Sequence, residues 1–352
     1  MGKAKRCRSV VLSASVAALG ATGACPATGA QAAPPDARNA APAPAVASPQ
    51  PARASAASRG WGSRVRLARG ERLSISCASA SSCVAVGEAG KSFAYDGAGW
   101  RSLPSASPNE ETEYIGSISC PTTSYCLASD TSVEAIEYTN GVWGAPRAIV
   151  PADKGSIVGS TVSCESSSFC VVVDGAGDAA VYTNGAWGRA RRVTRYGITS
   201  VWCPRVDYCV AVDNDGDALT YSDGAWTRPR RVDTIAAPTS VSCASPGFCV
   251  AVLGSEYGGS YAMTFNGARW TSPTLVAGKL GGAGDDLEQV SCASASFCLA
   301  VGGNGHASVY DGHTWRATRF TTARSDGEQV SCPDTTRCVV VDSTGTVYTY
   351  TA

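Results

Sequence analysis

The chain has 352 residues, with 29 basic and 29 acidic side chains, 38 glycines and 16 cysteines. The zero net charge argues against the strongly basic surface of a nucleic-acid-binding protein, and the charged fraction of only 16% argues against long surface helices and coiled coils. We therefore expect no nucleic-acid partner, and the sixteen cysteines are the feature that most needs an explanation.

The N-terminus predicts a secretory signal peptide over residues 1–32. A basic stretch without acids precedes an Ala-rich apolar run from Val10 to about Ala24, and this run is too short for a membrane span. Cleavage after Ala30-Gln31-Ala32 predicts a secreted protein. Alternatively, Thr22-Gly23-Ala24-Cys25 fits a loose lipobox, in which an acylated Cys25 would anchor the chain on the outer face of the cell membrane. No later stretch is long enough to form a transmembrane span.

Residues 33–59 contain 11 alanines and 6 prolines in 27 positions and almost no residues that could form a core. This composition predicts a disordered linker. The folded part of the chain is therefore expected to span residues 60–352.

The folded part repeats one pair of cysteines seven times, always with five residues between the two. The first cysteines of successive pairs lie 43, 44, 39, 40, 49 and 40 residues apart. A period of about 40 residues is typical of a propeller blade. The pairs are Cys77 and Cys83, Cys120 and Cys126, Cys164 and Cys170, Cys203 and Cys209, Cys243 and Cys249, Cys292 and Cys298, and Cys332 and Cys338.

Each repeat predicts four short strands. In the sixth repeat these are QVSC (289–292), CLAVG (298–302), HASVY (306–310) and TWRATRF (314–320), separated by Gly-, Asp- and Ser-rich turns. No segment shows sustained helical periodicity, so an α-solenoid is excluded. We expect an all-β protein, a seven-bladed β-propeller.

The seventh repeat ends after three strands, and the N-terminus supplies the missing one. Residues 61–67, WGSRVRL, closely resemble WGRARRV at 187–193, which forms the fourth strand of its own repeat. We expect the strand at 61–67 to complete the last blade in a 3+1 closure, which removes the exposed edges of an open array.

The repeated cysteines predict one disulfide per blade. Cysteines at i and i+6 can face each other across a tight hairpin, with Cα atoms near the ~5.5 Å that a disulfide accepts. Zinc ribbons need C-x2-C pairs, and the chain has only two histidines, so a metal role is disfavoured. A redox motif would be a single C-x-x-C.

Asn-Gly and Asp-Gly pairs before the repeat tryptophans predict tight hairpins whose aromatics pack between blades.

The repeat SVSC-x5-C-VAVG…YDGxxW resembles the cysteine-paired propeller repeats of secreted proteins from high-GC Gram-positive bacteria, over residues 61–352. That resemblance implies the architecture and no single activity. The turn also resembles the Asp-box of sialidases, although Asp311 stands one place late in SVYDGHTW.

Connections in a propeller alternate between two faces. The turns between second and third strands should share one face with the blade-to-blade connections, and this variable-loop face is the expected binding surface. Its candidate binding residues are Glu110, Glu111, Glu113, Asp174, Asp178, Arg195, Tyr196, Asp213, Asp215, Asp217, Glu256, Tyr257, Asn304 and His306.

We consider three hypotheses for the chemistry of this face. Asp213, Asp215 and Asp217 resemble the start of a calcium loop but lack its distal glutamate, so we expect no cofactor, with calcium as the alternative. Glycoside hydrolysis would need two converging carboxylates, and a sialidase-type site would also need inward arginines. A basic zone is either a charge-protected edge or a contact for an anionic cell-surface polymer; its members are Arg189, Arg191, Arg192, Arg195, Arg228, Arg230 and Arg231.

The sequence therefore predicts a secreted, monomeric, non-enzymatic binding module. Its ligand is expected to be a carbohydrate, a cell-wall polymer or a protein. A sialidase-like glycoside hydrolase and a purely structural surface protein are the alternatives.

Overall fold

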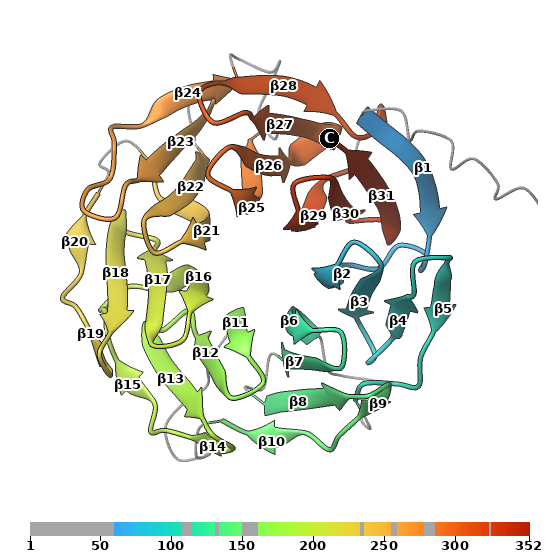
Figure 1. Cartoon of the computed structure of the whole chain (residues 1–352), viewed down its shortest axis with the longest axis horizontal. Coiled ribbons are helices and arrows are strands. Elements are labelled where there is room, and N and C mark those ends of the chain that lie inside the picture. Colours follow the sequence, from blue (N-terminus) through green and yellow to red (C-terminus); the bar gives the residue numbers. More distant parts are fainter. Residues whose placement is uncertain are drawn as a thin grey trace, which may run out of the picture. The chain divides into compact units, whose positions relative to one another are not determined.

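The computed structural model describes residues 60–107, 115–130, 134–149, 161–232, 236–254, 259–277, 286–323 and 325–352. They belong to one compact unit, Ala56–Ala352, which forms a closed ring of seven antiparallel sheets. Figure 1 shows the ring with one strand of each sheet at its centre. Among these residues, no helix is long and apolar enough to cross a membrane.

Each sheet is one blade. The blades are numbered 1 to 7 in the chain order of their inner strands, and the strands of a blade are counted from the central channel outward. The inner strands are β2 (Leu73–Ser79), β6 (Ile115–Thr122), β11 (Thr161–Ser166), β16 (Ile198–Arg205), β21 (Pro238–Ser245), β25 (Leu287–Ser294) and β29 (Gly327–Asp334). The second strands are β3 (Ser82–Gly87), β7 (Tyr125–Asp130), β12 (Phe169–Val173), β17 (Tyr208–Asp213), β22 (Phe248–Gly254), β26 (Phe297–Gly302) and β30 (Arg337–Asp342). The third strands are β4 (Ser92–Tyr95), β8 (Glu134–Thr139), β13 (Asp178–Thr183), β18 (Asp217–Ser222), β23 (Ser260–Phe265), β27 (His306–Tyr310) and β31 (Thr346–Thr351).

The outer strands differ most from blade to blade. Blades 1 and 6 have one continuous outer strand each, β5 (Trp100–Ser102) and β28 (Trp315–Arg319), whereas in blade 5 an isolated bridge from Trp270 to Phe265 precedes β24 (Thr274–Ala277). In blades 2, 3 and 4 the outer strand is broken into two short pieces, which are β9 (Val142–Trp143) with β10 (Arg147–Ala148), β14 (Ala186–Trp187) with β15 (Arg191–Arg192), and β19 (Ala225–Trp226) with β20 (Arg230–Arg231). A 3-10 turn, η2 (Gly303–Gly305), joins β26 to β27.

The hydrophobic core lies between the blades. The second strand of each blade is covered on both faces by its neighbours, so sequences such as FCVVV and FCLAVG are buried throughout. Seven clusters of buried side chains result, one at each junction between neighbouring blades.

The ring closes with the N-terminal strand, as predicted. Strand β1 (Gly60–Arg66) pairs with β31 and is the outer strand of blade 7. The other three strands of this blade are β29, β30 and β31. The Trp61 indole lies 5.1 Å from the Tyr350 ring and donates a hydrogen bond of 3.1 Å to Thr318 Oγ1 on blade 6. The two ends of the propeller are thus held together by strand pairing and by aromatic packing.

All seven predicted disulfides are present, one in each blade. Their Cα atoms are 3.9–4.1 Å apart, so the expected 5.5 Å was wrong. The cysteines occupy a non-hydrogen-bonded position of the hairpin, where opposite residues approach more closely than at a hydrogen-bonded one.

The N–H group of the first cysteine consequently points away from its own hairpin, and in six blades it points to the preceding blade. In six junctions the serine before the first cysteine of one blade accepts the N–H of the first cysteine of the next, at 2.9–3.0 Å. These serines are Ser76, Ser119, Ser163, Ser242, Ser291 and Ser331. They form a belt of hydrogen bonds around the central channel.

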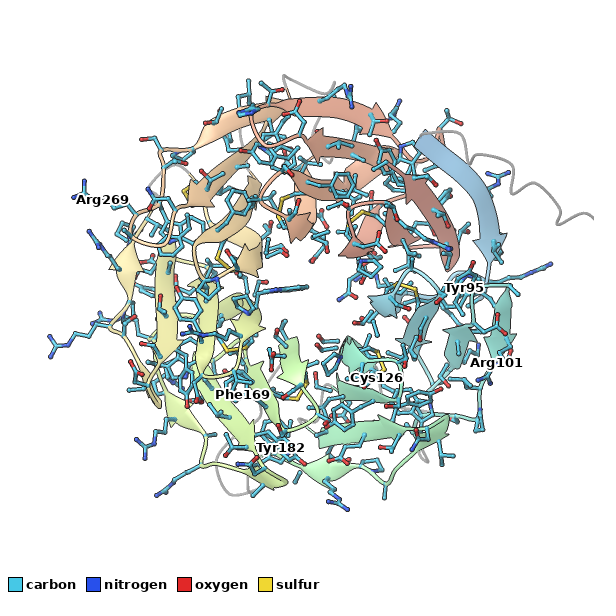
Figure 2. The ribbon with its side chains drawn as sticks, viewed as in Figure 1. Tyr95, Arg101, Cys126, Phe169, Tyr182 and Arg269 are labelled. Carbon is cyan, nitrogen blue, oxygen red and sulfur yellow. A yellow bond between two sulfur atoms is a disulfide. The ribbon has the colours of Figure 1, made fainter. Side chains whose placement is uncertain are left out.

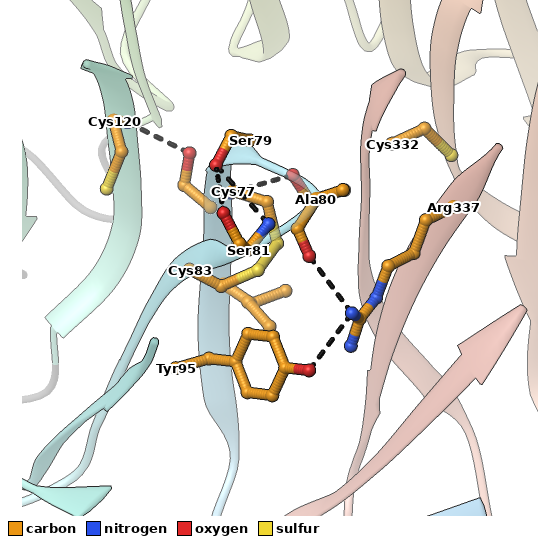
Figure 3. The surroundings of a disulfide bond; sticks show 12 residues. Cys77, Ser79, Ala80, Ser81, Cys83, Tyr95, Cys120, Cys332 and Arg337 are labelled. Atoms are coloured by element: carbon orange, nitrogen blue, oxygen red, sulfur yellow. Dashed lines mark hydrogen bonds between the residues drawn. A yellow bond between two sulfur atoms is a disulfide. The ribbon is translucent and has the colours of Figure 1, made fainter. Parts of the chain in front are cut away.

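Figure 3 shows the junction between blades 7 and 1, which has an unusual polar contact beside the Cys77–Cys83 disulfide. Arg337 Nη1 donates to the Ala80 carbonyl and to the Tyr95 hydroxyl, both at 3.0 Å, and the guanidinium carbon lies 4.5 Å from the Tyr95 ring centre. Blades 2 to 6 have an aromatic residue at this position, such as Phe169. A cation–π contact therefore replaces aromatic packing where the ring closes.

Candidate functional site

The variable-loop face is built as the alternation of connections predicts. The N–H of Val193, in a blade-to-blade connection, donates to the carbonyl of Gly177, in a second-to-third strand turn, at 2.9 Å. A second pair, Gly305 N–H to the Ser325 carbonyl at 2.8 Å, repeats this contact between blades 6 and 7. The turns and the blade connections thus support each other on one face.

Asp174 and Asp213, two of the predicted binding residues, are buried within this face and are not presented on it. Asp213 Oδ1 accepts the N–H groups of Asp215 and Asp217 at 3.1 and 2.9 Å, and its Oδ2 accepts the Thr194 hydroxyl at 2.9 Å. Asp174 closes the corresponding turn of blade 3, and burial raises the pKa of its carboxyl group. These two carboxylates hold turns together by accepting backbone N–H groups, although Asp174 Oδ2 is buried without a described partner.

The other acids of these turns pair with arginines of their own blade. Arg231 Nε lies 3.0 Å from Asp217 Oδ1, and Arg231 also forms an ion pair with Asp215. In blade 3, Arg192 lies 3.2 Å from Asp178. In the described part of the chain no group of three or more His, Cys, Asp or Glu side chains is placed to hold a metal ion.

The remaining candidates are scattered. Asn304 has a left-handed backbone, with φ of 53°, and its N–H donates to Asp326. His306 is buried, 3.1 Å from Arg319 Nη2. Glu110, Glu111, Glu113, Glu256, Tyr257 and the proposed lipidation site Cys25 lie outside the described residues.

A long groove runs along the outer side of the ring between blades 3 and 4, and we call it the blade 3–4 groove. It consists of two adjoining hollows of about 520 and 530 Å³ that share Arg192, Val193, Arg228 and Pro229. One hollow extends to Ala225 beside the outer hairpin of blade 4, and the other reaches Arg195 and Tyr196 on the variable-loop face. Four predicted candidates, Arg195, Tyr196, Asp215 and Asp217, thus meet here.

The groove has an apolar floor and basic walls. Its floor contains Val181, Val193 and Trp226, which pack against the cluster between blades 3 and 4. Its walls carry exposed arginines that form no ion pair with any described carboxylate; these are Arg189, Arg191, Arg195 and Arg228. Because Arg192 and Arg231 are already paired, the excess positive charge resides on these four side chains.

The groove lies where the outer strands of both blades are interrupted. In blade 3 the interruption follows Gly188, whose N–H still donates to the Val181 carbonyl at 2.8 Å, and in blade 4 it includes Pro229, which has no N–H to donate. A continuous strand such as β28 would follow the sheet edge instead. The sequence predicted an outer edge strand as one interpretation of the basic zone; Arg191, Arg192, Arg230 and Arg231 lie on such strands, whereas Arg189, Arg195 and Arg228 lie in connections. The hollow between the two blades was not predicted.

The middle of the central channel has an uncharged lining. The residues that line it come from the inner strands and are mainly serine and aliphatic, with Gln289, Gln329 and Trp202; none of them carries a charge. The glycosidase alternative requires carboxylates or arginines converging at the channel. The residues that line this part of the channel do not supply them, but the inner strands β25 and β29 carry Glu288 and Glu328, each one residue before a glutamine of the lining.

Acidic side chains gather beside blades 6, 7 and 1. Glu328 lies 3.4 Å from Arg72. The side chain of Glu288 keeps exposed surface, but partial desolvation by its neighbours raises its pKa; the charges of Asp326, Glu328 and Asp286 raise it further, whereas Arg72 opposes the shift. Burial likewise raises the pKa of Glu328.

These raised pKa values predict a pH dependence of stability. A carboxyl group whose pKa is higher in the folded state stabilises the fold fully below its unfolded pKa, and this contribution is lost as pH rises through the folded pKa. Glu288→Gln should therefore melt higher than the parent chain at pH 7, and the difference should vanish near pH 4, as measured by calorimetry. The exposed Glu88→Gln serves as the control. Equal pH profiles for Glu288→Gln and the parent chain would contradict the assignment.

Comparisons with known proteins identify the fold. No protein-family model and no curated protein matches the chain. The structure described as YCF48 bound to D1 peptide has a TM-score of 0.65 and 14% identity, covering 83% of this chain and 97% of its own. YCF48 from Cyanidioschyzon merolae has a TM-score of 0.63 and 17% identity, covering 83% and 99%. The WD40 β-propeller domain of Doa1 has a TM-score of 0.65 and 7% identity, covering 84% and 97%. At these identities the likeness shows the β-propeller fold alone.

Proposed function

We propose that the chain is a secreted, non-enzymatic interaction module that holds an extended acidic segment of a partner protein in the blade 3–4 groove. The observation that carries the proposal is the pairing of an apolar floor with four arginines that lack carboxylate partners in the described structure. Seven disulfides fit an oxidising compartment, which supports secretion. The similar structure described as bound to a D1 peptide supports a peptide ligand.

The groove favours a ligand with two properties. Arginine guanidinium groups bind carboxylates through two parallel hydrogen bonds, so a ligand that supplies carboxylates satisfies the walls. The floor, with Trp226 and Val193, favours apolar side chains between those carboxylates. In an extended peptide, successive side chains point to opposite sides, so an alternating acidic and apolar segment matches both surfaces.

The test uses an eight-residue peptide that alternates Asp with Leu or Tyr, and a control peptide with Asn in place of Asp. We expect the full chain to bind only the acidic peptide in isothermal titration calorimetry, and more weakly at high salt. The double variant Arg191→Glu/Arg228→Glu should lose at least about tenfold in affinity.

The matched control is the double variant Arg269→Glu/Arg316→Glu, which reverses the charge of two exposed arginines outside the groove. Its net charge equals that of the groove variant. Arg269 points outward from blade 5 (Figure 2). An equal loss of affinity in both double variants would show a general charge effect and refute the groove. Tighter binding of an anionic cell-wall polymer than of the peptide would favour that ligand class instead. Absence of any ligand would favour the structural alternative.

A further inference from the structure

The serine belt around the channel is interrupted at one junction, between blades 4 and 5. Trp202 stands where the other six blades have serine, directly before the first cysteine. An indole has no oxygen to accept a hydrogen bond, and no acceptor for the Cys243 N–H is present in the described structure. The chain thus gives up a hydrogen bond that every other junction retains.

Trp202 instead occupies the channel. Part of its side chain packs on the cluster between blades 4 and 5, and the rest remains partly exposed and lines the channel. Trp202 is the only aromatic residue among those that line it. Figure 2 shows side chains of the inner strands surrounding this central opening.

The groups around the indole are neutral and have hydrogen-bonding capacity left. Three belt serines, Ser76, Ser119 and Ser331, line the channel and are only half-buried; each accepts a backbone N–H and donates to no described acceptor, so its hydroxyl proton is available. Gln329 Oε1 accepts the Ile75 N–H at 2.8 Å, which leaves its amide NH₂ as a donor. The amide of Gln289 makes no hydrogen bond in the described structure, and it lines the same channel.

We propose that the channel beside Trp202 binds the end of a neutral saccharide. The carbon-bound face of a sugar ring is apolar and can stack on an indole, and its hydroxyls both donate and accept hydrogen bonds. Serine hydroxyls and glutamine amides match those hydroxyls without any charge. The open space is about 80 Å³, which is smaller than a whole sugar ring, so only part of the terminal ring enters and the rest stacks at the channel mouth. This site is separate from the blade 3–4 groove.

The test replaces Trp202 with the residue that the other six blades carry. Trp202→Ser restores an acceptor for the Cys243 N–H, which offsets part of the packing that is lost on the cluster between blades 4 and 5, so we expect its melting temperature to stay within a few degrees of that of the parent chain. The probes are cellohexaose, maltohexaose and the hexamer of N-acetylglucosamine. Binding is measured by calorimetry and by the change in tryptophan fluorescence, at saccharide concentrations up to about 10 mM.

The parent chain should bind at least one of these saccharides, and Trp202→Ser should lose at least about tenfold in affinity for it. Trp202→Phe keeps an aromatic surface and should lose less. Trp315→Phe, at the outer strand of blade 6, should bind like the parent chain. All three variants should still bind the acidic peptide, which separates this proposal from the one above.

Two results would overturn the proposal. One is that the parent chain binds none of the three saccharides. The other is that Trp202→Ser binds them as well as the parent chain does. If the parent chain binds no saccharide and Trp202→Ser melts several degrees lower, Trp202 is a packing residue.

Discussion

Removing β1 is expected to open the ring. A chain that begins at residue 67 lacks Trp61 and the strand that pairs with β31, so blade 7 is left with three strands and an exposed edge. The loss of a packed Trp alone costs about 3 kcal/mol, and each lost strand hydrogen bond adds about 1 kcal/mol. We expect the melting temperature to fall by more than about 10 °C, and the protein to aggregate through the free edge of β31.

The matched control is a chain that begins at Ala56, which keeps β1 and lacks only residues before the compact unit. Its melting temperature should equal that of the full chain. Calorimetry measures the melting temperature, and light scattering measures aggregation. If the two truncated chains melt together, β1 contributes nothing to closure, and the 3+1 arrangement is not what stabilises the ring.

Reducing the seven disulfides should have the largest effect on stability. Each closes a loop of seven residues, for which the chain-entropy model gives about 2.4 kcal/mol. Even with incomplete additivity, full reduction should lower the melting temperature by at least about 15 °C. Scanning calorimetry with and without a phosphine reductant measures this difference, and mass spectrometry verifies complete reduction.

A single bridge can be tested without a reductant. The double variant Cys243→Ala/Cys249→Ala should lose about 2 kcal/mol and leave six bridges intact. A fully reduced protein that melts within about 2 °C of the oxidised one would contradict a stabilising role for the disulfides.

The repeat pattern was sufficient to predict the fold. Cysteine pairs at a fixed spacing count the blades because each pair occupies the same hairpin, and the resemblance of 61–67 to 187–193 identifies the closing strand. The Cα separation of the cysteines was not predicted correctly, because the sequence does not reveal which hairpin positions are hydrogen-bonded.

The candidate site could be predicted only in part. Arg195 and Tyr196 were chosen from their blade connection, and the structure places them at one end of the groove. Asp213 was chosen because it is charged and lies next to a turn. Its position directly after the buried run CVAV was the signal that its side chain continues the buried strand.

The groove itself depends on two neighbouring blades. It requires the interruptions near Gly188 and Pro229 to lie beside each other, and residues 41 positions apart in sequence give no direct sign of this. Trp202 was visible in the sequence, since alignment of the repeats places it where six blades have serine. Its significance appears only once those serines are seen to bridge the blades.

The most direct test of the account is to locate the acidic peptide on the full chain by hydrogen–deuterium exchange. The groove predicts slower exchange of backbone amides in residues 186–196 and 225–232 when the peptide is bound, with little change in the cysteine hairpins of blades 1 and 6. Protection confined to those hairpins or to blades 5 to 7, with the two groove segments unchanged, would contradict it.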